Sequence, residues 1–361
     1  MTDWDDPSVR RVCTDLFNRI GLWKASRAFG APADSMRMRS DFLGCQNLVY
    51  EYVLDGKELI LRVTYPPDRP FEQILAELDF VKYLADKGAS VSRPVPSVNG
   101  NLIERVPVGD WVFLAVSFVK GRGMRVPDND YHYREGAPIE EYFRNWGRTL
   151  GKLHALAKDY EPPNPLVRRP MWVETRSGDH VRARVPEAFP IVRRRLEAMI
   201  SESRKLPQDK DSYGLIHGDF NDGNFTVDYS NGDITVFDFD DACYNWFMYD
   251  LACAWEAGLG RTMFEPDVEK RREFMKRYFE QAMAGYRLEN DIEPQWLDRL
   301  SFFIKMVEMD SALSYFRYYS WNTLSQEEMS KLRYIVHCIE KETPYFGFFD
   351  PIYSAKKPFT I

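Results

Sequence analysis

The sequence has no apolar run that approaches the length of a membrane span, so we expect no transmembrane helix. It has only five cysteines, an odd number without a CxxC pair, which is typical of reduced thiols in a cytoplasm. The first residues, MTDWDDPSVRR, are acidic and polar and do not predict a secretory signal. We therefore expect a cytoplasmic protein without a membrane partner.

An excess of positive charge is also missing, because the net charge is −7 at pH 7. A general nucleic-acid-binding protein is expected to be basic, so nucleic acid is not an expected partner. We find no internal repeat and no low-complexity tract. Apolar residues are abundant at 44%, with 24 Phe, 20 Tyr and 9 Trp in 361 residues. This composition predicts a large core, and the length suits two lobes.

The chain opens with a predicted helix and a predicted strand pair. Pro7 and the apolar face that follows it predict a helix that ends at Gly21. Asp55-Gly56 lies between two β-rich runs, Leu48–Leu54 and Lys57–Val63. An Asp-Gly pair in that position predicts a two-residue hairpin.

Helical spacing then predicts a helix over 71–87, ended by Gly88. Strands are expected around Asn99-Gly100 and Gly109-Asp110, the last of them Trp111–Val119. Beyond it, the patterns are helical over 140–156, 268–286, 295–319 and, after a Ser325/Glu328 capping box, up to 341. This order predicts an α+β, protein-kinase-like bilobal fold. Its N-lobe would span residues 1–119 and its helical C-lobe residues 120–361.

The stretch from Gly214 to Ala242 contains seven aspartates between apolar runs. We expect strands over 225–229 and 234–239, joined by a two-residue turn at Asn231-Gly232. Positions that sum to 463 would then face each other, so this register predicts that Asn224 and Asp238 reach the same open end of the hairpin.

Asp219 precedes Asn224 by five residues, in the loop that leads into the hairpin. The loop and the hairpin would thus bring two carboxylates and an amide oxygen together. Hard oxygen ligands of this kind suit Mg²⁺, which keeps several waters and binds substrate phosphates. The pattern predicts a magnesium-dependent site that handles phosphate.

The stretch His217-Gly218-Asp219-Phe220-Asn221-Asp222-Gly223-Asn224 resembles the HxDxxxxN catalytic loop of the aminoglycoside phosphotransferase / choline kinase / homoserine kinase superfamily. Asp238-Phe239-Asp240 resembles its metal-binding segment, and Tyr249-Asp250-Leu251-Ala252 resembles the helix start that follows. Further resemblances, at 44–63, 77–97 and 147–156, extend over most of residues 40 to 255.

The resemblance implies roles for individual residues. Asp219 would orient the acceptor hydroxyl and take its proton, while Asn224 and Asp238 would hold Mg²⁺ against the nucleotide phosphates. Arg62 would contact the phosphates and pair with Glu77, although relatives commonly have lysine at this position. Arginine is still permanently charged and presents a fork of N–H groups that can donate hydrogen bonds to a phosphate.

The resemblance also implies which residues bind the nucleotide. Gly44 would let the backbone approach a phosphate. Adenine would bind backbone groups of the lobe connector, around Ser117 to Val119. The nucleotide would be ATP, with GTP left open.

Several residues in and near the loop keep simpler interpretations. His217 fits a structural role better than a catalytic one, and Asp250 is expected to brace the loop through backbone hydrogen bonds. Asp222 is interpreted as a turn residue. For Asp240, a metal or substrate role and a solvated role stay open. Tyr315, Tyr318 and Tyr319 are expected to pack in the core, with an aromatic wall for a cationic acceptor as the alternative.

We therefore predict an ATP-dependent phosphotransferase that acts on a hydroxyl of a small molecule. Two other hypotheses stay open. One is a catalytically silent kinase-like scaffold, favoured only by Arg62. The other is a metal-dependent hydrolase with His217, Asp219 and Asp238 as ligands, which would bind a transition metal and need no nucleotide.

Overall fold

The computed structural model describes residues 7–39, 47–66, 69–176, 185–262, 265–318 and 324–342. The chain forms two compact units. The first comprises the described residues up to Gly123 together with Tyr160–Arg169 and Thr235–Asp240, and the second comprises Met124–Asp159, Pro170–Ile234 and the described residues from Asp241 on. Two later segments therefore return to the first unit. The predicted boundary between residues 119 and 120 stays a prediction.

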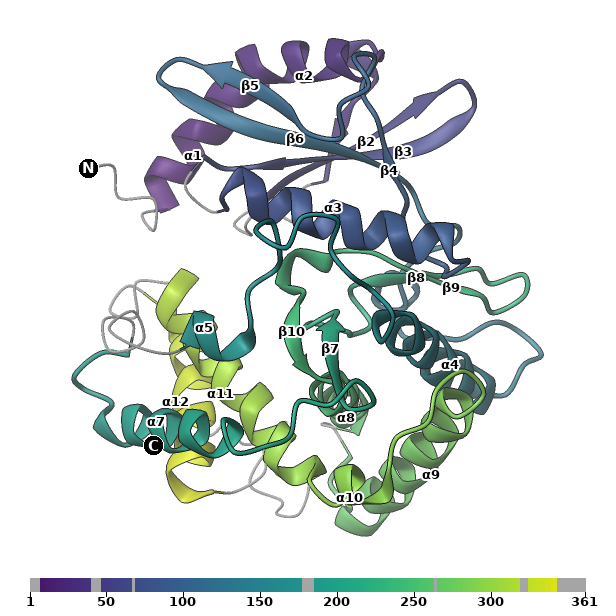
Figure 1. Cartoon of the computed structure of the whole chain (residues 1–361), viewed down its shortest axis with the longest axis vertical. Coiled ribbons are helices and arrows are strands. Elements are labelled where there is room, and N and C mark those ends of the chain that lie inside the picture. The colour runs from purple at the N-terminus through teal and green to yellow at the C-terminus, as the bar shows by residue number, and fades with distance from the viewer. Residues whose placement is uncertain are drawn as a thin grey trace. The chain divides into compact units, whose positions relative to one another are not determined.

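The first unit is built on an antiparallel sheet with the strand order β1-β2-β3-β6-β4, and β5 also pairs with β6 (Figure 1). The strands are β1 Arg37–Met38, β2 Asn47–Leu54, β3 Lys57–Thr64, β4 Pro94–Val95, β5 Glu104–Val108 and β6 Trp111–Val119. The predicted Asp55-Gly56 hairpin is confirmed, because Leu54 lies opposite Lys57. Both turn residues have positive φ, as the turn requires.

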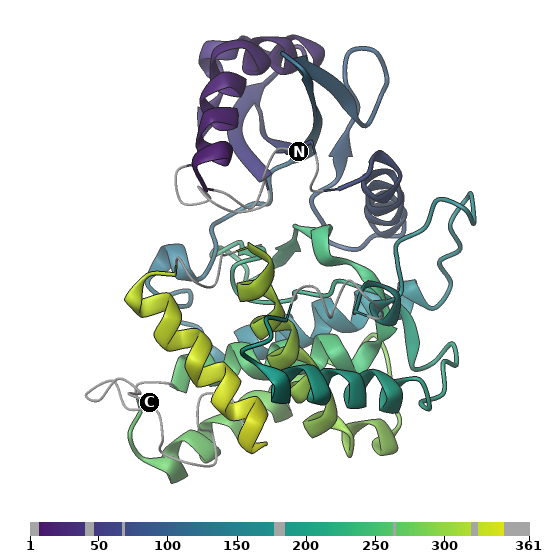
Figure 2. The same cartoon turned by 90° about the vertical axis from the view of Figure 1, so that its left-hand side faces the viewer.

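Helices cover both faces of this sheet (Figures 1 and 2). Side chains alternate along β6, so Phe113 and Ala115 join one core while Leu114, Val116 and Phe118 join the other. The N-terminal helices α1 (Pro7–Leu16) and α2 (Leu22–Ala28) pack into the first core. Helix α3 (Phe71–Asp86) packs into the second core and ends as predicted before Gly88, which has a φ of 83°.

The predicted end of the first helix at Gly21 is wrong. A π-helical turn, Phe17–Gly21, continues directly into α2, and Gly21 keeps a right-handed φ of −72°. A Cβ atom at Gly21 would lie 2.4 Å from the Phe17 ring and 2.9 Å from the Val108 side chain. The glycine therefore permits close packing of the helix on β5 and does not end it.

The second unit is mostly helical. Its helices are α4 Ile139–Ala157, α5 Trp172–Arg176, α7 Pro190–Ser203, α8 Phe247–Thr262, α9 Val268–Tyr286, α10 Pro294–Leu297, α11 Leu300–Tyr318 and α12 Gln326–Lys341. Strands β7 (Tyr213–Ile216) and β10 (Cys243–Trp246) pair antiparallel. The sheet of the first unit and the helices of the second confirm the predicted α+β class.

Two helix predictions have different outcomes. The helix predicted over 295–319 is two helices, α10 and α11, so that prediction is wrong at its first turn. The capping box before α12 is confirmed, because Ser325 and Glu328 exchange side-chain-to-backbone hydrogen bonds. Short 3₁₀ turns lie at Ala33–Ser35, Pro127–Asn129 and Phe239–Asp241.

The predicted aspartate-rich hairpin exists as β8 (Phe225–Val227) and β9 (Ile234–Val236), but its predicted register is wrong. The amide of Asp228 donates to the carbonyl of Asp233 over 2.8 Å, so these positions sum to 461 and not 463. The turn is longer than two residues, and side-chain and main-chain oxygens within it accept hydrogen bonds from its amides. Asn231 Oδ1 accepts from the Asp233 amide, and the Asp228 carbonyl accepts from Gly232.

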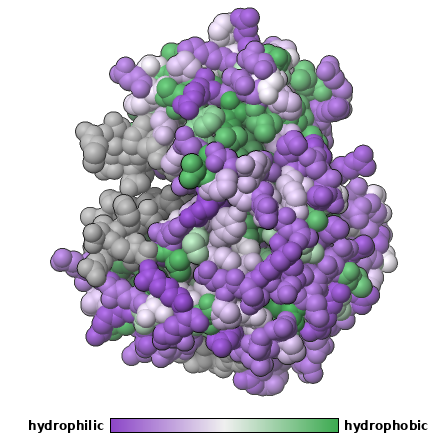
Figure 3. All heavy atoms as spheres, viewed as in Figure 1, coloured by the Kyte–Doolittle hydropathy of each residue, from purple (hydrophilic) through white to green (hydrophobic). Residues whose placement is uncertain are grey.

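The surface of the second unit is mainly hydrophilic on the face shown in Figure 3. Within the described residues, no helix is long and apolar enough to cross a membrane.

Candidate active site

The predicted catalytic loop belongs to the second unit and follows β7 directly. Asp250, fully buried in the first turn of α8, accepts hydrogen bonds from the amides of His217 and Gly218 at 2.9 and 2.8 Å. Gly218 has a φ of 84°, and a Cβ atom there would lie 2.4 Å from the Asp241 carbonyl oxygen. The predicted bracing role of Asp250 is therefore what the structure shows, and the loop requires glycine at 218.

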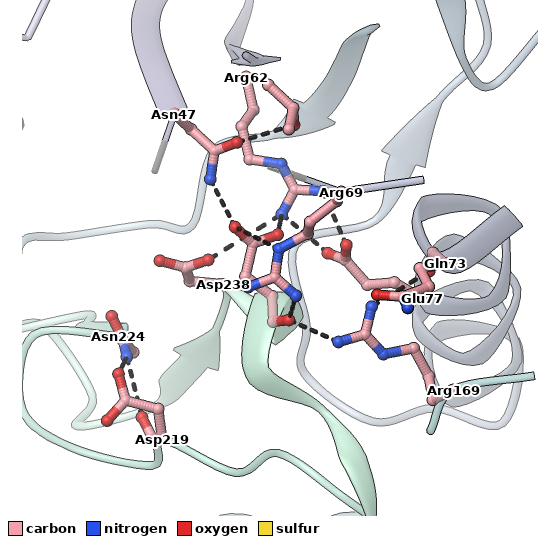
Figure 4. A network of polar contacts seen from close by, with 11 residues as sticks. Asn47, Arg62, Arg69, Gln73, Glu77, Arg169, Asp219, Asn224 and Asp238 are labelled. Atoms are coloured by element: carbon pink, nitrogen blue, oxygen red, sulfur yellow. Dashed lines mark hydrogen bonds and ion pairs between the residues drawn. The ribbon is translucent and has the colours of Figure 1, made fainter. Parts of the chain in front are cut away.

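The carboxylate of Asp219 is oriented by two amide side chains. Asn224 donates to Asp219 Oδ2 at 2.7 Å (Figure 4). Asn221 donates to Asp219 Oδ1 at 2.9 Å. His217 is buried, and its Nδ1 accepts from the Asp219 amide at 3.3 Å, which is a structural contact. The structure thus brings Asp219 and Asn224 together, as the sequence predicts.

The electrostatic surroundings of Asp219 suit a base. The Asp219 side chain is open to solvent, but the surrounding protein reduces the hydration of its carboxylate. This desolvation and the negative charge of the nearby Asp241 raise the pKa of Asp219 to about 7. The hydrogen bonds from Asn224 and Asn221 act in the opposite direction. A carboxylate with a pKa close to the working pH is well matched to proton transfer.

Asp222 is more than a turn residue. Its side chain is buried, and its two oxygens are held separately, one by the Tyr142 hydroxyl at 2.5 Å and one by Arg261 at 2.6 Å. The Arg261 guanidinium also lies over the Tyr142 ring, 5.0 Å from its centroid. The catalytic loop is therefore anchored to α8 at a second point, near the end of that helix.

The other predicted site residues lie in the first unit. Both terminal nitrogens of Arg62 donate to Glu77, each over 2.8 Å, and both side chains are buried (Figure 4). The predicted pair is therefore present, and a mere surface ion pair is excluded. Arg62 Nη1 is also 2.7 Å from Asp240 Oδ1.

Asp240 is buried, with 5% exposure, which excludes a solvated role for its side chain. Burial alone would raise its pKa, but Arg62 and Arg69 outweigh that effect and hold the pKa of Asp240 well below its usual range. Asn47 donates a further hydrogen bond to Asp240 Oδ2. Asp240 therefore serves as the counter-ion of the arginines in this unit.

Asp238 presents a different environment two residues earlier. Its side chain is 41% exposed, and its Oδ1 lies 3.9 Å from Arg62 Nη1. The backbone of Asp238 is left-handed, with a φ of 62°, which is costly for a residue with a side chain. The geometry leaves an accessible carboxylate on a backbone that other contacts must hold in place.

The structure describes only some of the predicted nucleotide contacts. Gly44 lies outside the described residues. The Ser117 side chain is buried and bonds to the Tyr52 hydroxyl at 2.7 Å. The Val119 amide already donates to the Arg93 carbonyl at 2.9 Å, so it is engaged within the sheet edge. Adenine binding around Ser117 to Val119 stays a prediction.

The sequence did not single out a group of carboxylates on α8 and α11. Burial, together with the charges of Glu308, Asp219 and Asp310, raises the pKa of Glu256 well above its usual value. Glu308 and Asp310 are both buried. Asp310 accepts from Trp172, Tyr249 and Arg176. No local spacing signals this group, because its members meet only when the two helices pack.

Aromatic residues that follow the aspartate-rich stretch have core positions. Trp246 and Tyr249 are buried and bonded to Pro207 and Asp310. Tyr315 is partly buried, while the Tyr318 side chain and Tyr319 lie outside the described residues. The role of these tyrosines stays a prediction.

The residues fit a divalent metal of the magnesium type. Asn224 bonds to Asp219 through its side-chain nitrogen, so these hydrogen bonds do not use the side-chain oxygen of Asn224. Asp238 has an accessible carboxylate. Such hard oxygen donors suit Mg²⁺. Among the described residues, no three His, Cys, Asp or Glu side chains are grouped to hold a metal ion.

Comparison with known sequences identifies related proteins. The sequence pattern of the phosphotransferase enzyme family matches residues 43–288. An amicoumacin kinase from Bacillus subtilis is 32% identical over 330 residues, which cover 91% of this chain and 93% of that protein. A homoserine kinase from Polaromonas naphthalenivorans is 29% identical over 196 residues, which cover 50% of this chain and 53% of that protein.

Solved structures of kinases are also similar to this chain. An amicoumacin kinase in complex with AMP-PNP, Ca²⁺ and Ami is 28% identical, with a TM-score of 0.79 over 91% of this chain and 95% of that chain. A microcompartment-associated aminopropanol kinase is 22% identical, with a TM-score of 0.67 over 93% of this chain and 99% of that chain. These neighbours confirm the predicted kinase-like fold.

Proposed function

Because the chain belongs to the phosphotransferase enzyme family, we propose that it transfers the γ-phosphoryl group of ATP to a hydroxyl group of a small molecule. The chain is a kinase-type phosphotransferase, as are relatives that span nearly its whole length. A catalytically silent scaffold is therefore not favoured. The identities of the donor nucleotide, the metal and the acceptor are our proposals.

One observation carries the proposal, the arrangement around Asp219. Its carboxylate is held by Asn221 and Asn224, is open to solvent and has a pKa of about 7. In phosphoryl transfer the protein needs chiefly to position the reactants and to neutralise charge. Asp219 would accept a hydrogen bond from the acceptor hydroxyl, orient that oxygen and take its proton.

The metal would be Mg²⁺, held through Asn224 and Asp238. When bound, the ion would neutralise charge on the nucleotide phosphates. Arg62 lies 3.9 Å from Asp238 and is fixed by Glu77, so it would add permanent positive charge beside the phosphates.

The acceptor would carry an amino group as well as the hydroxyl. Two related proteins are kinases of amicoumacin and of aminopropanol. Within the second unit, Glu256, Glu308 and Asp219 are close enough for their charges to interact, and Glu256 Oε1 is buried without a hydrogen-bond partner. An ammonium group would supply a positive charge to these carboxylates.

Radiolabelled phosphate transfer tests the proposal. The purified protein would be incubated with Mg²⁺ and γ-labelled ATP against amino alcohols, aminoglycosides, amicoumacins, simple sugars and a generic protein substrate. We expect label on an amine-bearing alcohol, and a loss of at least about 100-fold in turnover for Asp219→Asn with nucleotide binding retained. Absence of any labelled acceptor and of ATP turnover, or near-normal turnover by Asp219→Asn, would contradict the proposal.

A further inference from the structure

Two arginines from separate segments of the first unit meet at one backbone oxygen. Arg69, between β3 and α3, and Arg169, at the end of the returning segment 160–169, both donate to the main-chain carbonyl of Asp240 (Figure 4). Both side chains are buried, at 7% and 3% exposure. We call Arg69 and Arg169 the arginine clamp.

The arginine clamp holds the backbone just after Asp238. A buried guanidinium is costly unless its charge is compensated, and the Asp240 carboxylate provides compensation, since its Oδ2 lies 3.7 Å from Arg69 Nε. One neutral donor is enough to satisfy a carbonyl, whereas this carbonyl accepts from two charged donors, whose hydrogen bonds are stronger. The clamp thus concentrates strong contacts on a single peptide unit.

That peptide lies two residues beyond the left-handed Asp238. A left-handed backbone is disfavoured for residues with a Cβ atom, less strongly for Asp than for most, so neighbouring contacts help to fix this conformation. Arg62 and Asn47 hold the Asp240 side chain, and the arginine clamp holds its carbonyl. The segment is therefore fixed by its side chain and its main chain together.

Arg169 adds a link to α3. Its second terminal nitrogen donates to the Gln73 carbonyl at 3.2 Å, in the first turn of the helix that carries Glu77 (Figure 4). One side chain therefore joins the segment that carries Asp238 to the helix that orients Arg62.

We infer that Arg69 and Arg169 are positioning residues that aim the Asp238 carboxylate at the divalent metal of the nucleotide complex. The inference rests on the proposed function. Neither arginine would touch the nucleotide or the acceptor; both act through the backbone of Asp240. Residues behind a metal ligand commonly matter for affinity in this way, and their loss costs about 10–100-fold in metal binding.

Mn²⁺ binding tests this inference apart from turnover. Free Mn²⁺ would be followed by electron paramagnetic resonance during titration of protein with AMP-PNP, for wild type, Arg169→Met, Arg69→Met and Arg169→Lys. We expect at least about a tenfold weaker Mn²⁺ dissociation constant for the two Met variants and a smaller loss for Arg169→Lys. Exposed Arg19, in the π-helical turn of the first unit, offers the matched control, and Arg19→Met should stay within about twofold of wild type.

Kinetics supply a second readout. For Arg169→Met, the Mg²⁺ concentration for half-maximal turnover should rise by at least about tenfold, with kcat at saturating metal within about threefold of wild type. If Arg169→Met does not fold, Arg169→Lys takes its place, with a rise larger than that of Arg19→Met.

Three outcomes are distinguishable. Wild type that binds no Mn²⁺–nucleotide and turns over no ATP would refute the proposed function. Wild type that binds normally while Arg169 variants match Arg19→Met would refute only the positioning role. A lowered melting temperature with unchanged Mn²⁺ affinity would also refute it, because the clamp would then be purely structural.

Discussion

The identity of residue 62 shows how one side chain can organise several charges. A lysine has a single ammonium, whereas the planar fork of Arg62 reaches both oxygens of Glu77 and one of Asp240 at 2.7–2.8 Å. Both carboxylates are buried, so each depends on this arginine for compensation. The departure from lysine therefore matches the additional buried carboxylate, Asp240, that the guanidinium serves.

Removing this guanidinium should destabilise the first unit. Arg62→Met leaves Glu77 and Asp240 buried with much of their compensation gone, and breaking a buried pair costs about 3–5 kcal/mol. Chemical unfolding of the variant and the wild type would measure the change in the free energy of unfolding. The double variant Arg62→Met/Glu77→Met should lose less than Arg62→Met alone, because it leaves one fewer uncompensated carboxylate.

An exposed ion pair provides the control for this measurement. Arg272 pairs with Glu269 at 2.7 Å on the surface of α9, with both side chains largely exposed. Arg272→Met should change the free energy of unfolding by less than about 1 kcal/mol. Equal losses for Arg62→Met and Arg272→Met would show that the buried network contributes no special stability.

His154 makes stability depend on pH. It is buried beneath the catalytic loop, bonded to Tyr286 and to Asp250, and burial holds its pKa below the ordinary value of 6.5. The folded state therefore binds fewer protons at this site than the unfolded state once the pH falls below about 6.5. This contribution to stability is complete above that pH and declines below it, by up to about 1.4 kcal/mol per pH unit.

The dependence should disappear with the imidazole. Unfolding of His154→Gln between pH 7 and pH 5 should show a shallower loss of stability than wild type, while the exposed control His132→Gln should keep the wild-type slope. Comparing slopes removes any constant loss that the substitution itself causes. Parallel slopes for wild type and His154→Gln would contradict the assignment.

At the scale of elements, helices α4 and α9 approach through glycines. A Cβ atom at Gly147 would lie 1.7 Å from the Ala282 carbonyl oxygen, and one at Gly285 would lie 1.9 Å from that of Arg144. The backbones therefore pack directly against each other, and no side chain separates them. A sequence shows the glycines but not which helix they face.

Gly147→Ala should thus separate the two helices. Because the obstructing atoms are backbone, the substitution should cost about 1–3 kcal/mol or more in the free energy of unfolding. Gly260 in α8 is the matched control, since a Cβ atom there would meet nothing within 4 Å. Gly260→Ala should stabilise by up to about 1 kcal/mol, and a similar gain for Gly147→Ala would disprove the close approach.

Local signals predicted those elements whose causes are local. The Asp55-Gly56 hairpin and the Ser325 capping box depend on residues within a few positions of each other, and both are confirmed. The predictions for Gly21 and for the turn at Asn231-Gly232 are wrong. Gly21 makes room for Phe17 and for Val108 of β5, and the Asn231 side chain bonds a turn amide.

For the whole molecule, the motif predicted the loop partners but not the network that supports them. The pairs Asp219–Asn224 and Arg62–Glu77 lie where the resemblance implies. Arg69 and Arg169 had no sequence signal, because they reach Asp240 from positions 171 and 71 residues away. Long-range charge compensation of this kind emerges only when the segments fold together.

The proposed function finally predicts how nucleotide and metal affect the stability of the complete chain. A ligand that binds only the folded state at 100 times its Kd adds about 2.7 kcal/mol to the free energy of unfolding. AMP-PNP with Mg²⁺ should therefore raise the melting temperature, and AMP-PNP with EDTA should raise it less, because the phosphates lose their counter-ion. Asp238→Asn should reduce the difference between the two conditions, since a neutral amide binds Mg²⁺ more weakly than the accessible carboxylate that it replaces. Asp219→Asn should preserve the difference, because Asp219 is assigned to the acceptor and not to the metal. Equal shifts with and without Mg²⁺ in the wild type would remove the metal from the proposal.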